Sequence, residues 1–111
     1  MNNIIGIGVD LIDLSRIDTK LAKRFLTTKE FDLFNNLTGK RALEFLGGRL
    51  AAKEAVFKAL PENNFHFTEL EILYDENCKP ICQFKDYIIH ISITHEKNTA
   101  LAFAIVTKTT H

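Results

Sequence analysis

Apolar and polar residues alternate near the start of the chain, which predicts a β-strand with two different faces. The aliphatic residues of one face are Ile5, Ile7, Val9 and Leu11. Asp10 falls on the other face, together with Gly6 and Gly8. Because glycine has no side chain, that face leaves room beside the carboxylate for a ligand or for another backbone.

The last part of the chain also follows strand patterns. Short strands are predicted at about residues 69–74 and 81–84, with a turn over 75–80 between them. Isoleucines then alternate with polar residues over 89–94, and a loop over 95–98 leads into a strand over 100–106, as in an antiparallel hairpin. The alanines of this last strand share one face: Ala100, Ala102 and Ala104. Side chains this small would let a helix lie close against the sheet.

Helical spacing begins after the first strand. Ser15 and Asp18 have the spacing of a capping box, and apolar residues recur every four positions, so a helix is predicted over 16–26. Thr27 and Glu30 form a second capping box, which opens a short helix ending near residue 39. Cations at spacings of three and four fall on one face of the first helix: Arg16, Lys20, Lys23 and Arg24. The sequence therefore predicts a local basic surface.

A long helix is predicted over residues 40–60, where Pro61 ends it. Its main apolar positions are Leu43, Leu46, Leu50, Phe57 and Leu60. At 100° per residue, Lys53 lies inside this stripe, Glu54 lies at its margin, and Lys58 lies one turn beyond Glu54. One interpretation is a solvated face with an ordinary Glu–Lys pair. The other is functional, because charges that border buried surface need partners, as catalytic groups and metal ligands do.

Composition indicates one globular domain over residues 1–111, with 46% hydrophobic residues. Fourteen Lys and Arg balance fourteen Asp and Glu, so no overall field attracts nucleic acid or an anionic membrane. The apolar start is interrupted by glycines and an acid, which argues against a signal peptide or a membrane span and favours a cytoplasmic protein. Cys78 and Cys82 are expected to be reduced thiols, because no second ligand pair completes a zinc site.

Several polar positions have two interpretations. Asp10 is either a capping acid at a strand end or a ligand, and His95 is either a turn residue or a functional one. The opening Gly-x-Gly is not a dinucleotide-binding motif, because Leu11 occupies the position of the third glycine. Two separated carboxylates suit Mg²⁺, which takes few protein ligands and completes its shell with water and phosphate oxygens. The pattern favours phosphoryl chemistry without choosing a class of reaction.

Three segments together resemble the holo-acyl-carrier-protein synthases, a family of small 4'-phosphopantetheinyl transferases. They are GIGVDLIDLSRI at 6–17, FLGGRLAAKEAVFKAL at 45–60 and ISITHEKNTALAFAIV at 91–106. The resemblance implies the α+β fold of that family, with a long helix packed on an antiparallel sheet. It also implies a reaction, in which the phosphopantetheine arm of coenzyme A passes to a serine of an acyl carrier protein for fatty acid synthesis and adenosine 3',5'-bisphosphate is released.

The same resemblance implies roles for individual residues. Asp10 and Glu54 would hold Mg²⁺ against the pyrophosphate of coenzyme A, in a pocket that the neighbouring glycines keep open. Lys58 would stabilise the charge on the leaving phosphate, so the implied catalytic residues are Asp10, Glu54 and Lys58. The serine proton would pass either to Glu54 or to a water or hydroxide on the metal. Lys53 matches the same motif, without a firm role.

Binding residues are implied as well. Those for coenzyme A are Arg49, Lys58, Thr94 and His95. The basic first helix, with Phe25 beside its four cations, would dock the acidic surface of the acyl carrier protein. Members of the family are homotrimers with active sites between subunits, and the same assembly is expected for this chain.

Two segments depart from the family pattern. The sequence LPENNF at 60–65 lacks the glycine-rich loop that the family usually has near coenzyme A, and DENCKP at 75–80 has Cys78 where glycine is usual. An exposed thiol is therefore expected in that turn.

Two other functions compete with the transferase. The first is a non-catalytic module that binds acyl carrier proteins, which would not need Asp10, Glu54 or Lys58. The second is a Mg²⁺-dependent nuclease or phosphohydrolase, which is disfavoured because the sequence shows no basic groove with interleaved aromatic residues.

Overall fold

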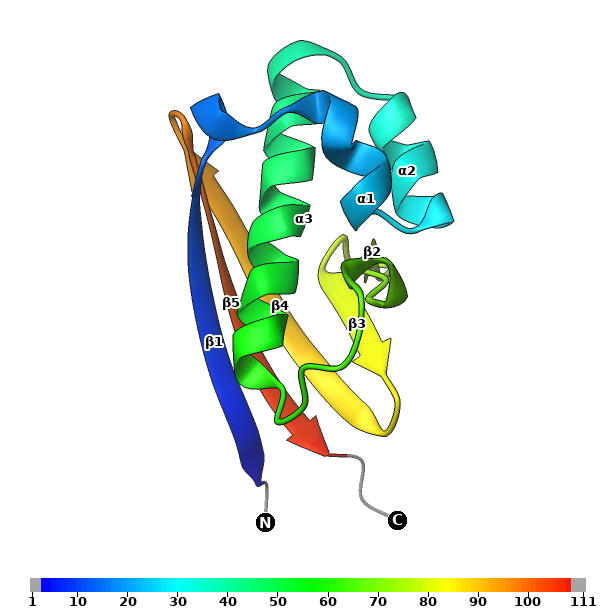
Figure 1. Ribbon diagram of the computed structural model, residues 1–111, viewed down its shortest axis with the longest axis vertical. Helices are drawn as coiled ribbons and strands as arrows, with labels where there is room; N and C mark the ends of the chain where they lie inside the picture. Colours follow the sequence, from blue (N-terminus) through cyan, green and yellow to red (C-terminus); the bar gives the residue numbers. More distant parts are fainter. Residues whose placement is uncertain (1–2, 109–111) are drawn as a thin grey trace.

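One antiparallel sheet and a layer of helices on one of its faces make up the computed structural model, which describes residues 3–108 (Figure 1). The remaining residues of the predicted domain, 1–2 and 109–111, lie outside the described part. The sheet has the strand order β1-β5-β4-β3-β2. Its strands are β1 (Ile4–Asp13), β2 (Leu73–Tyr74), β3 (Pro80–Phe84), β4 (Tyr87–Glu96) and β5 (Thr99–Lys108). The predicted α+β fold is confirmed.

The helices are α1 (Ala22–Phe25), α2 (Thr28–Asn35) and α3 (Gly39–Ala59), with short 3-10 turns at Leu14–Arg16, Thr19–Leu21 and Phe67–Glu69. The long helix α3 lies along the sheet, over β1, β5 and β4 (Figure 1). Its bounds differ from the predicted range 40–60 by one residue at each end. The capping box of α2 is confirmed, because Thr27 and Glu30 exchange hydrogen bonds between side chain and backbone. Within the described residues, no helix is long and apolar enough to cross a membrane.

Small residues decide how closely α3 approaches the sheet. A Cβ atom added at Gly8 would lie 2.8 Å from the carbonyl carbon of Ala55 on α3, and closer still to its oxygen. The buried alanines of this interface are Ala51, Ala52, Ala55 and Ala59 on α3 and Ala100, Ala102 and Ala104 on β5. The space beside Gly6 and Gly8 is therefore filled by the backbone of α3. Of the two predicted alternatives, the close approach of another backbone is confirmed, and the expectation that these glycines keep a ligand pocket open is wrong.

The predicted apolar stripe of α3 is also partly wrong. Leu46 and Leu60 are buried, but Leu43, Leu50 and Phe57 are only half-buried. The reason is the close approach of the backbones, which admits alanine between helix and sheet and displaces larger side chains to the margins.

The predicted strand at 69–74 is shorter, because only Leu73 and Tyr74 pair with β3. Ile72 does not join the ladder, since side chains take both of its backbone groups. Its N–H donates to Glu30 Oε2 at 2.9 Å, and its carbonyl accepts from Arg49 Nε at 3.1 Å. The predicted loop at 95–98 is likewise shorter, because residues 95 and 96 still pair with β5.

Candidate active site

Asp10, Glu54 and Lys58 come together where α3 passes over β1. The Nζ of Lys58 donates hydrogen bonds to Asp10 Oδ1 at 3.1 Å and to the carbonyl of Val9 at 3.0 Å. The side chain of Asp10 is only 17% exposed, whereas that of Lys58 is 53% exposed. Glu54 lies one turn before Lys58 on α3 and is half-buried. The fold therefore places all three predicted catalytic residues in one site.

The charges of this site do not balance. Burial raises the pKa of the Glu54 carboxyl, the charge of Asp10 raises it further, and Lys58 partly opposes the shift. Within residues 3–108, no group of three or more His, Cys, Asp or Glu side chains is placed to hold a metal. The pair of carboxylates nevertheless fits Mg²⁺, which needs few protein ligands. A divalent cation would also relieve the repulsion between the two acids.

Arg49 and His95 lie elsewhere, in a cavity of about 520 Å³ between α2, α3 and β4. The guanidinium of Arg49 stacks between the rings of Phe45 and Tyr74, whose centroids lie 4.4 and 4.8 Å from its central carbon. Its Nη2 is buried without a hydrogen-bond partner. His95 Nδ1 lies 3.1 Å from a carboxylate oxygen of Glu44. Arg41 and Arg49 both line this cavity, and guanidinium groups suit an anionic group.

Thr94 is not part of this cavity. Alternate residues of β4 point to opposite faces of the sheet, and Ile93 and His95 both line the cavity on the helix-covered face. The exposed side chain of Thr94 therefore points to the opposite face. The structure does not bring together the predicted coenzyme A residues Thr94 and His95 within one chain, because neighbours on a strand face opposite ways.

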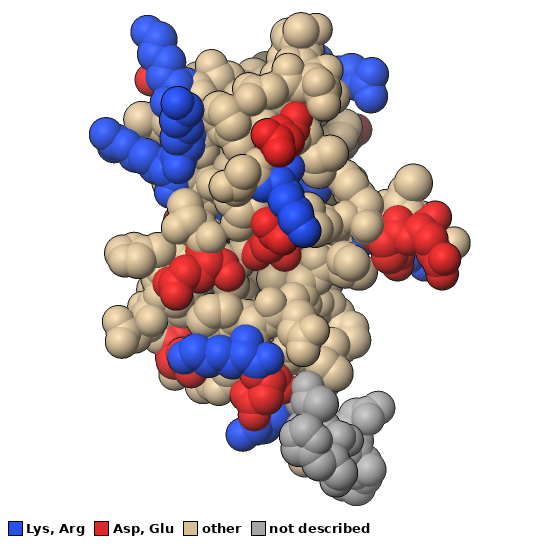
Figure 2. All heavy atoms as spheres, turned by 90° about the vertical axis from the view of Figure 1, so that its right-hand side faces the viewer, with Lys and Arg blue, Asp and Glu red and all other residues tan. Residues whose placement is uncertain are grey.

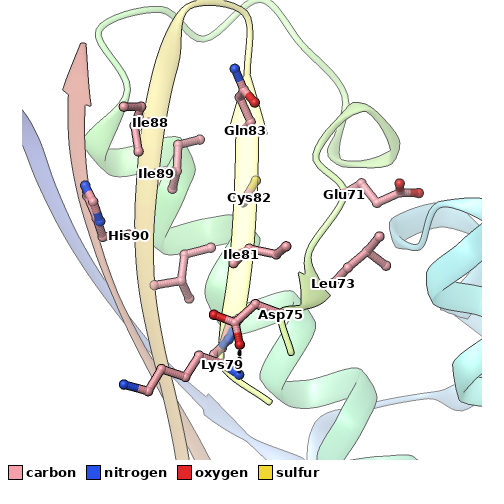
Figure 3. Close-up of a pocket in the computed structure, with 12 residues that line it drawn as sticks. Glu71, Leu73, Asp75, Lys79, Ile81, Cys82, Gln83, Ile88, Ile89 and His90 are labelled. Carbon is pink, nitrogen blue, oxygen red and sulfur yellow. Dashed lines mark hydrogen bonds between the residues drawn. The ribbon is translucent and has the colours of Figure 1, made fainter. Parts of the chain in front are cut away.

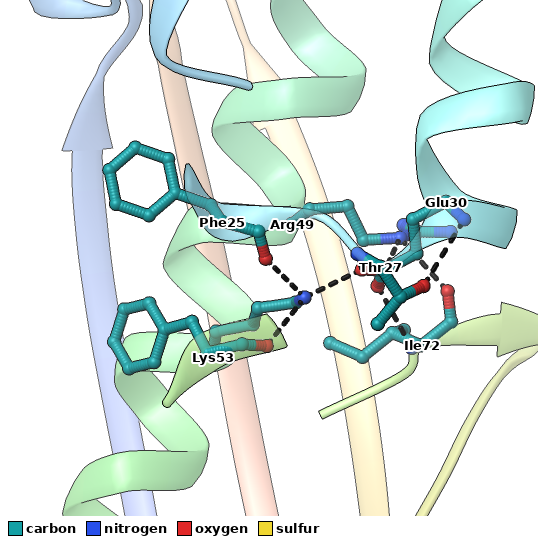
Figure 4. Close-up of polar contacts among 7 residues, drawn as sticks. Phe25, Thr27, Glu30, Arg49, Lys53 and Ile72 are labelled. Atoms are coloured by element: carbon teal, nitrogen blue, oxygen red, sulfur yellow. Dashed lines mark hydrogen bonds and ion pairs between the residues drawn. The ribbon is translucent and has the colours of Figure 1, made fainter. Parts of the chain in front are cut away.

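Lys53 belongs to a buried polar network and not to the open site (Figure 4). Its Nζ donates to Glu30 Oε1 and to the carbonyl of Phe25, both at 2.6 Å, and to the carbonyl of Phe67 at 2.9 Å. These bonds use all three N–H groups of the ammonium. Burial lowers the pKa of Lys53, and its hydrogen bond to Glu30 opposes that shift. Lys53 is therefore a structural residue.

Sequence reasoning missed the second role of Glu30. The capping box identified this residue, but its spacing gives no sign that Glu30 also accepts from Lys53 and from the N–H of Ile72. Arg49 Nε lies 3.8 Å from the same carboxylate. One buried acid thus connects α2, α3 and the segment before β2. Glu44 and Tyr74, which contact His95 and Arg49, were missed for the same reason: they are distant in sequence.

The basic segment before α2, residues 16–25, is not the continuous helix that the sequence predicts. Asp13 and Asp18 accept hydrogen bonds from the N–H groups of Ser15 and Lys20, so each starts a separate short turn, and the predicted capping box of Ser15 and Asp18 does not form. Only one turn of α-helix follows, as α1. The cations are nevertheless all exposed: Arg16, Lys20, Lys23 and Arg24. Lys and Arg side chains gather near the end of the molecule that carries α1 and α2 (Figure 2).

Phe25 is half-buried, with its ring 6.4 Å from that of Phe67. It therefore joins the packing beneath the basic segment, and only part of its ring is accessible to a partner. This limits the docking role that the resemblance implies for it.

A second and larger cavity, of about 830 Å³, lies along β3 and β4 (Figure 3). Its walls include four isoleucines, and Asp75, Lys79 and His90 are among its polar groups. It contains none of the predicted site residues. Cys82 also lines it, and burial raises the pKa of that thiol to about 12.

Comparisons with known proteins show the family of this chain. The model of the 4'-phosphopantetheinyl transferase superfamily matches residues 6–106. The chain belongs to this superfamily. A holo-[acyl-carrier-protein] synthase from Geobacillus sp. (strain WCH70) is 42% identical over 114 residues, covering 93% of this chain and 96% of that protein.

Solved structures of relatives have the same fold. A holo-(acyl-carrier-protein) synthase from Bacillus anthracis, solved in complex with CoA (3',5'-ADP), matches with a TM-score of 0.87 at 38% identity, covering 96% of this chain and 98% of that one. The synthase from Thermotoga maritima matches with a TM-score of 0.81 at 36% identity, covering 97% of this chain and 66% of that one. The predicted family and enzyme class, a phosphopantetheinyl transferase, are confirmed, and the two competing functions are set aside.

Proposed function

We propose that this chain transfers the 4'-phosphopantetheine group of coenzyme A to a serine of an apo acyl carrier protein, in a Mg²⁺-dependent reaction that releases adenosine 3',5'-bisphosphate. The observation that carries the proposal is the meeting of Asp10 and Lys58 beside Glu54, in a chain of this superfamily. The relatives named as holo-acyl-carrier-protein synthases, and the coenzyme A complex of one of them, support both substrates.

Asp10 and Glu54 would hold the Mg²⁺, which when bound supplies positive charge against the phosphate that leaves. Lys58 adds a cation on the same side. Two of its N–H groups bond to Asp10 and Val9, so a third is available for a phosphate oxygen. Glu54 lies in the same site and is one candidate acceptor for the proton of the serine. Transfer of that proton to water is the alternative.

The nucleotide end of coenzyme A would bind in the cavity of Arg49 and His95, which Arg41 also lines with a second guanidinium. Arg49 and Glu54 are five residues apart on α3, which corresponds to a rise of about 7.5 Å and a rotation of about 140°. The cavity and the acid pair therefore lie on different sides of α3. This separation supports active sites that two neighbouring subunits complete together.

We also propose a homotrimer. The face of the sheet that carries no helix exposes large apolar side chains, which a second copy would bury: Ile7, Val9, Leu11 and Phe103. Thr94 points to that same face, so its role in coenzyme A binding requires a neighbouring subunit. Light scattering of the purified protein tests the assembly, and a monomer at micromolar concentration would contradict it.

The basic segment at residues 16–25 is the proposed docking surface for the acyl carrier protein, because a local group of cations on a neutral chain favours one acidic partner. We further propose that residues 1–111 form a single transferase domain that serves fatty acid synthesis in the cytoplasm. The matched span of residues 6–106 supports the single domain.

Release of adenosine 3',5'-bisphosphate, separated by liquid chromatography, tests the reaction. Release is expected only when the apo carrier, coenzyme A and Mg²⁺ are all present, and EDTA should stop it. Release without a carrier would instead indicate hydrolysis of coenzyme A, and would contradict the proposed transfer.

A further inference from the structure

Tyr74, the last residue of β2, lines the cavity of about 520 Å³ between α2, α3 and β4. The preceding residue, Leu73, lines the other cavity, as expected when neighbouring side chains of a strand point to opposite sides. The backbone of Tyr74 pairs with that of Pro80 on β3. This pairing places the tyrosine ring at the wall of the smaller cavity.

A buried cation covers one face of the Tyr74 ring. The central carbon of the Arg49 guanidinium lies over this ring, 4.8 Å from its centroid, and over the ring of Phe45 at 4.4 Å. Arg49 is 2% exposed, and its Nε donates to the carbonyl of Ile72 at 3.1 Å. Because the guanidinium is held in this way, its stacking orders the tyrosine ring before any ligand binds.

The rest of the Tyr74 side chain is open to the cavity. The residue is 47% exposed, although Arg49 covers one face of its ring. Leu33, which is 39% exposed, and Leu37 add apolar surface to the same cavity. Burial of such surface is favourable, and aromatic rings prefer offset stacking. A flat ring laid on Tyr74 would therefore be stabilised.

More charged groups lie towards the start of α3. Arg41 lies eight residues before Arg49 on α3, which corresponds to a rise of about 12 Å, and both residues line the cavity. Glu44, one turn after Arg41, lies 3.1 Å from Nδ1 of His95. The cavity thus combines charged groups for phosphates with an aromatic surface around Tyr74. A nucleotide has the matching two parts, an anionic group and a flat base.

We propose that Tyr74 binds the adenine base of coenzyme A, by stacking the base on the face of its ring that Arg49 leaves open. This assignment rests on the function proposed above. It makes Tyr74 a specificity-determining residue, because stacking favours a ligand that has a base over one that lacks it.

Calorimetric binding of two ligands tests the contact. The first is adenosine 3',5'-bisphosphate, and the second is 1-deoxyribose 3,5-bisphosphate, which is the same molecule without its base. Tyr74→Leu should weaken binding of the adenosine ligand by at least about fivefold, or about 1 kcal/mol, and should leave binding of the base-free ligand unchanged. Tyr74→Phe is the matched variant, since it keeps the ring, and it should restore the affinity for the adenosine ligand.

Fluorescence provides a second test with the Tyr74 ring intact. The chain has no Trp and two Tyr, so in Tyr87→Phe the tyrosine emission comes from Tyr74 alone. Stacking of adenine should quench this emission, after correction for the absorbance of the base, whereas the base-free ligand should not. Unchanged emission with saturating adenosine ligand would overturn the stacking.

The binding measurements can also contradict the proposal. An equal loss of affinity for both ligands in Tyr74→Leu would assign Tyr74 to the packing of Arg49 and overturn the contact with the base. Unchanged affinity of Tyr74→Leu for the adenosine ligand would overturn it as well. If the parent protein binds neither ligand, the assignment of the cavity to coenzyme A fails together with this inference, whereas the transfer reaction is tested separately by the release of adenosine 3',5'-bisphosphate.

Discussion

Gly8→Ala is the substitution that most directly connects the packing of this chain with its proposed activity. The added Cβ would lie 2.8 Å from the carbonyl carbon of Ala55, whereas ordinary contact begins at 3.4 Å, so β1 and α3 must separate by at least 0.6 Å. The carbonyl oxygen of Ala55 lies closer still to the added Cβ, so it requires a larger separation of β1 and α3. Backbone atoms cannot rotate away as side chains do. We therefore expect a cost near the upper end of overpacking, about 3 kcal/mol.

That cost converts into a measurable loss of thermal stability. At about 2.1 cal/mol/K per residue, unfolding of 111 residues has an entropy near 0.23 kcal/mol/K, so Tm should fall by about 13 °C. The same movement separates Asp10 on β1 from Glu54 and Lys58 on α3. Because a displacement of about 1 Å in a reacting group can cost about 100-fold in rate, transfer at a temperature where the variant remains folded should fall by a similar factor.

Gly39→Ala is the matched control for this prediction. Nothing lies within 4 Å of a Cβ at Gly39, but its φ of 57° is unfavourable for alanine. The control should lose about 1–2 kcal/mol of stability and keep its transfer rate. Scanning calorimetry and single-turnover transfer, measured on both variants, give the comparison. A Gly8→Ala protein with Tm within about 2 °C of the parent, or with unchanged transfer, would refute the packing explanation.

Three further predictions concern the charged residues. Lys53→Met should cost about 3–5 kcal/mol, because it leaves Glu30 short of its partner in a buried site, and denaturant unfolding that shows a loss below about 1 kcal/mol would contradict this. Glu54→Gln should raise Tm at neutral pH without Mg²⁺, because a raised carboxyl pKa means that the folded protein loses stability as pH rises through that pKa. The substitution should also remove the rise in Tm that Mg²⁺ gives the parent protein. A Mg²⁺-dependent rise in Tm of equal size in both proteins would oppose the metal assignment. Charge reversal at Arg16 and Arg24 should raise KM for the carrier by about tenfold or more at low salt and leave the affinity for coenzyme A unchanged, whereas an unaltered KM would exclude this segment from docking.

Local patterns in the sequence predicted those parts of the fold that local interactions determine. The alternation in β1, the capping box of Thr27 and Glu30 and the length of α3 all depend on residues close together in the chain. Lys53 was correctly placed inside the buried face of α3 by its helical angle. Helical spacing placed Lys58 one turn beyond Glu54, and the contact of Lys58 with Asp10 agrees with the family resemblance, whereas the catalytic roles of these residues stay predictions.

Long-range contacts and local hydrogen bonds from side chains to the backbone decided the features that the sequence patterns did not reveal. The strand predicted at 69–74 is short because Glu30 and Arg49 bond the backbone of Ile72. The apolar stripe of α3 shifted towards alanine because Gly8 admits the helix backbone so closely. The first helix is interrupted by short turns at Asp13 and Asp18, whose side chains bond to N–H groups two residues ahead. Hydrophobic periodicity does not report any of these contacts.

The most direct test of the central claim is the intact mass of an apo acyl carrier protein after incubation with this chain, coenzyme A and Mg²⁺. Parallel reactions should contain EDTA, the Asp10→Ala variant, or a carrier whose acceptor serine is replaced by alanine. We predict a gain of one phosphopantetheine group in the complete reaction and no gain in the three controls. An unchanged carrier mass in the complete reaction, or an equal gain in the presence of EDTA, would contradict a Mg²⁺-dependent transfer at the site of Asp10, Glu54 and Lys58.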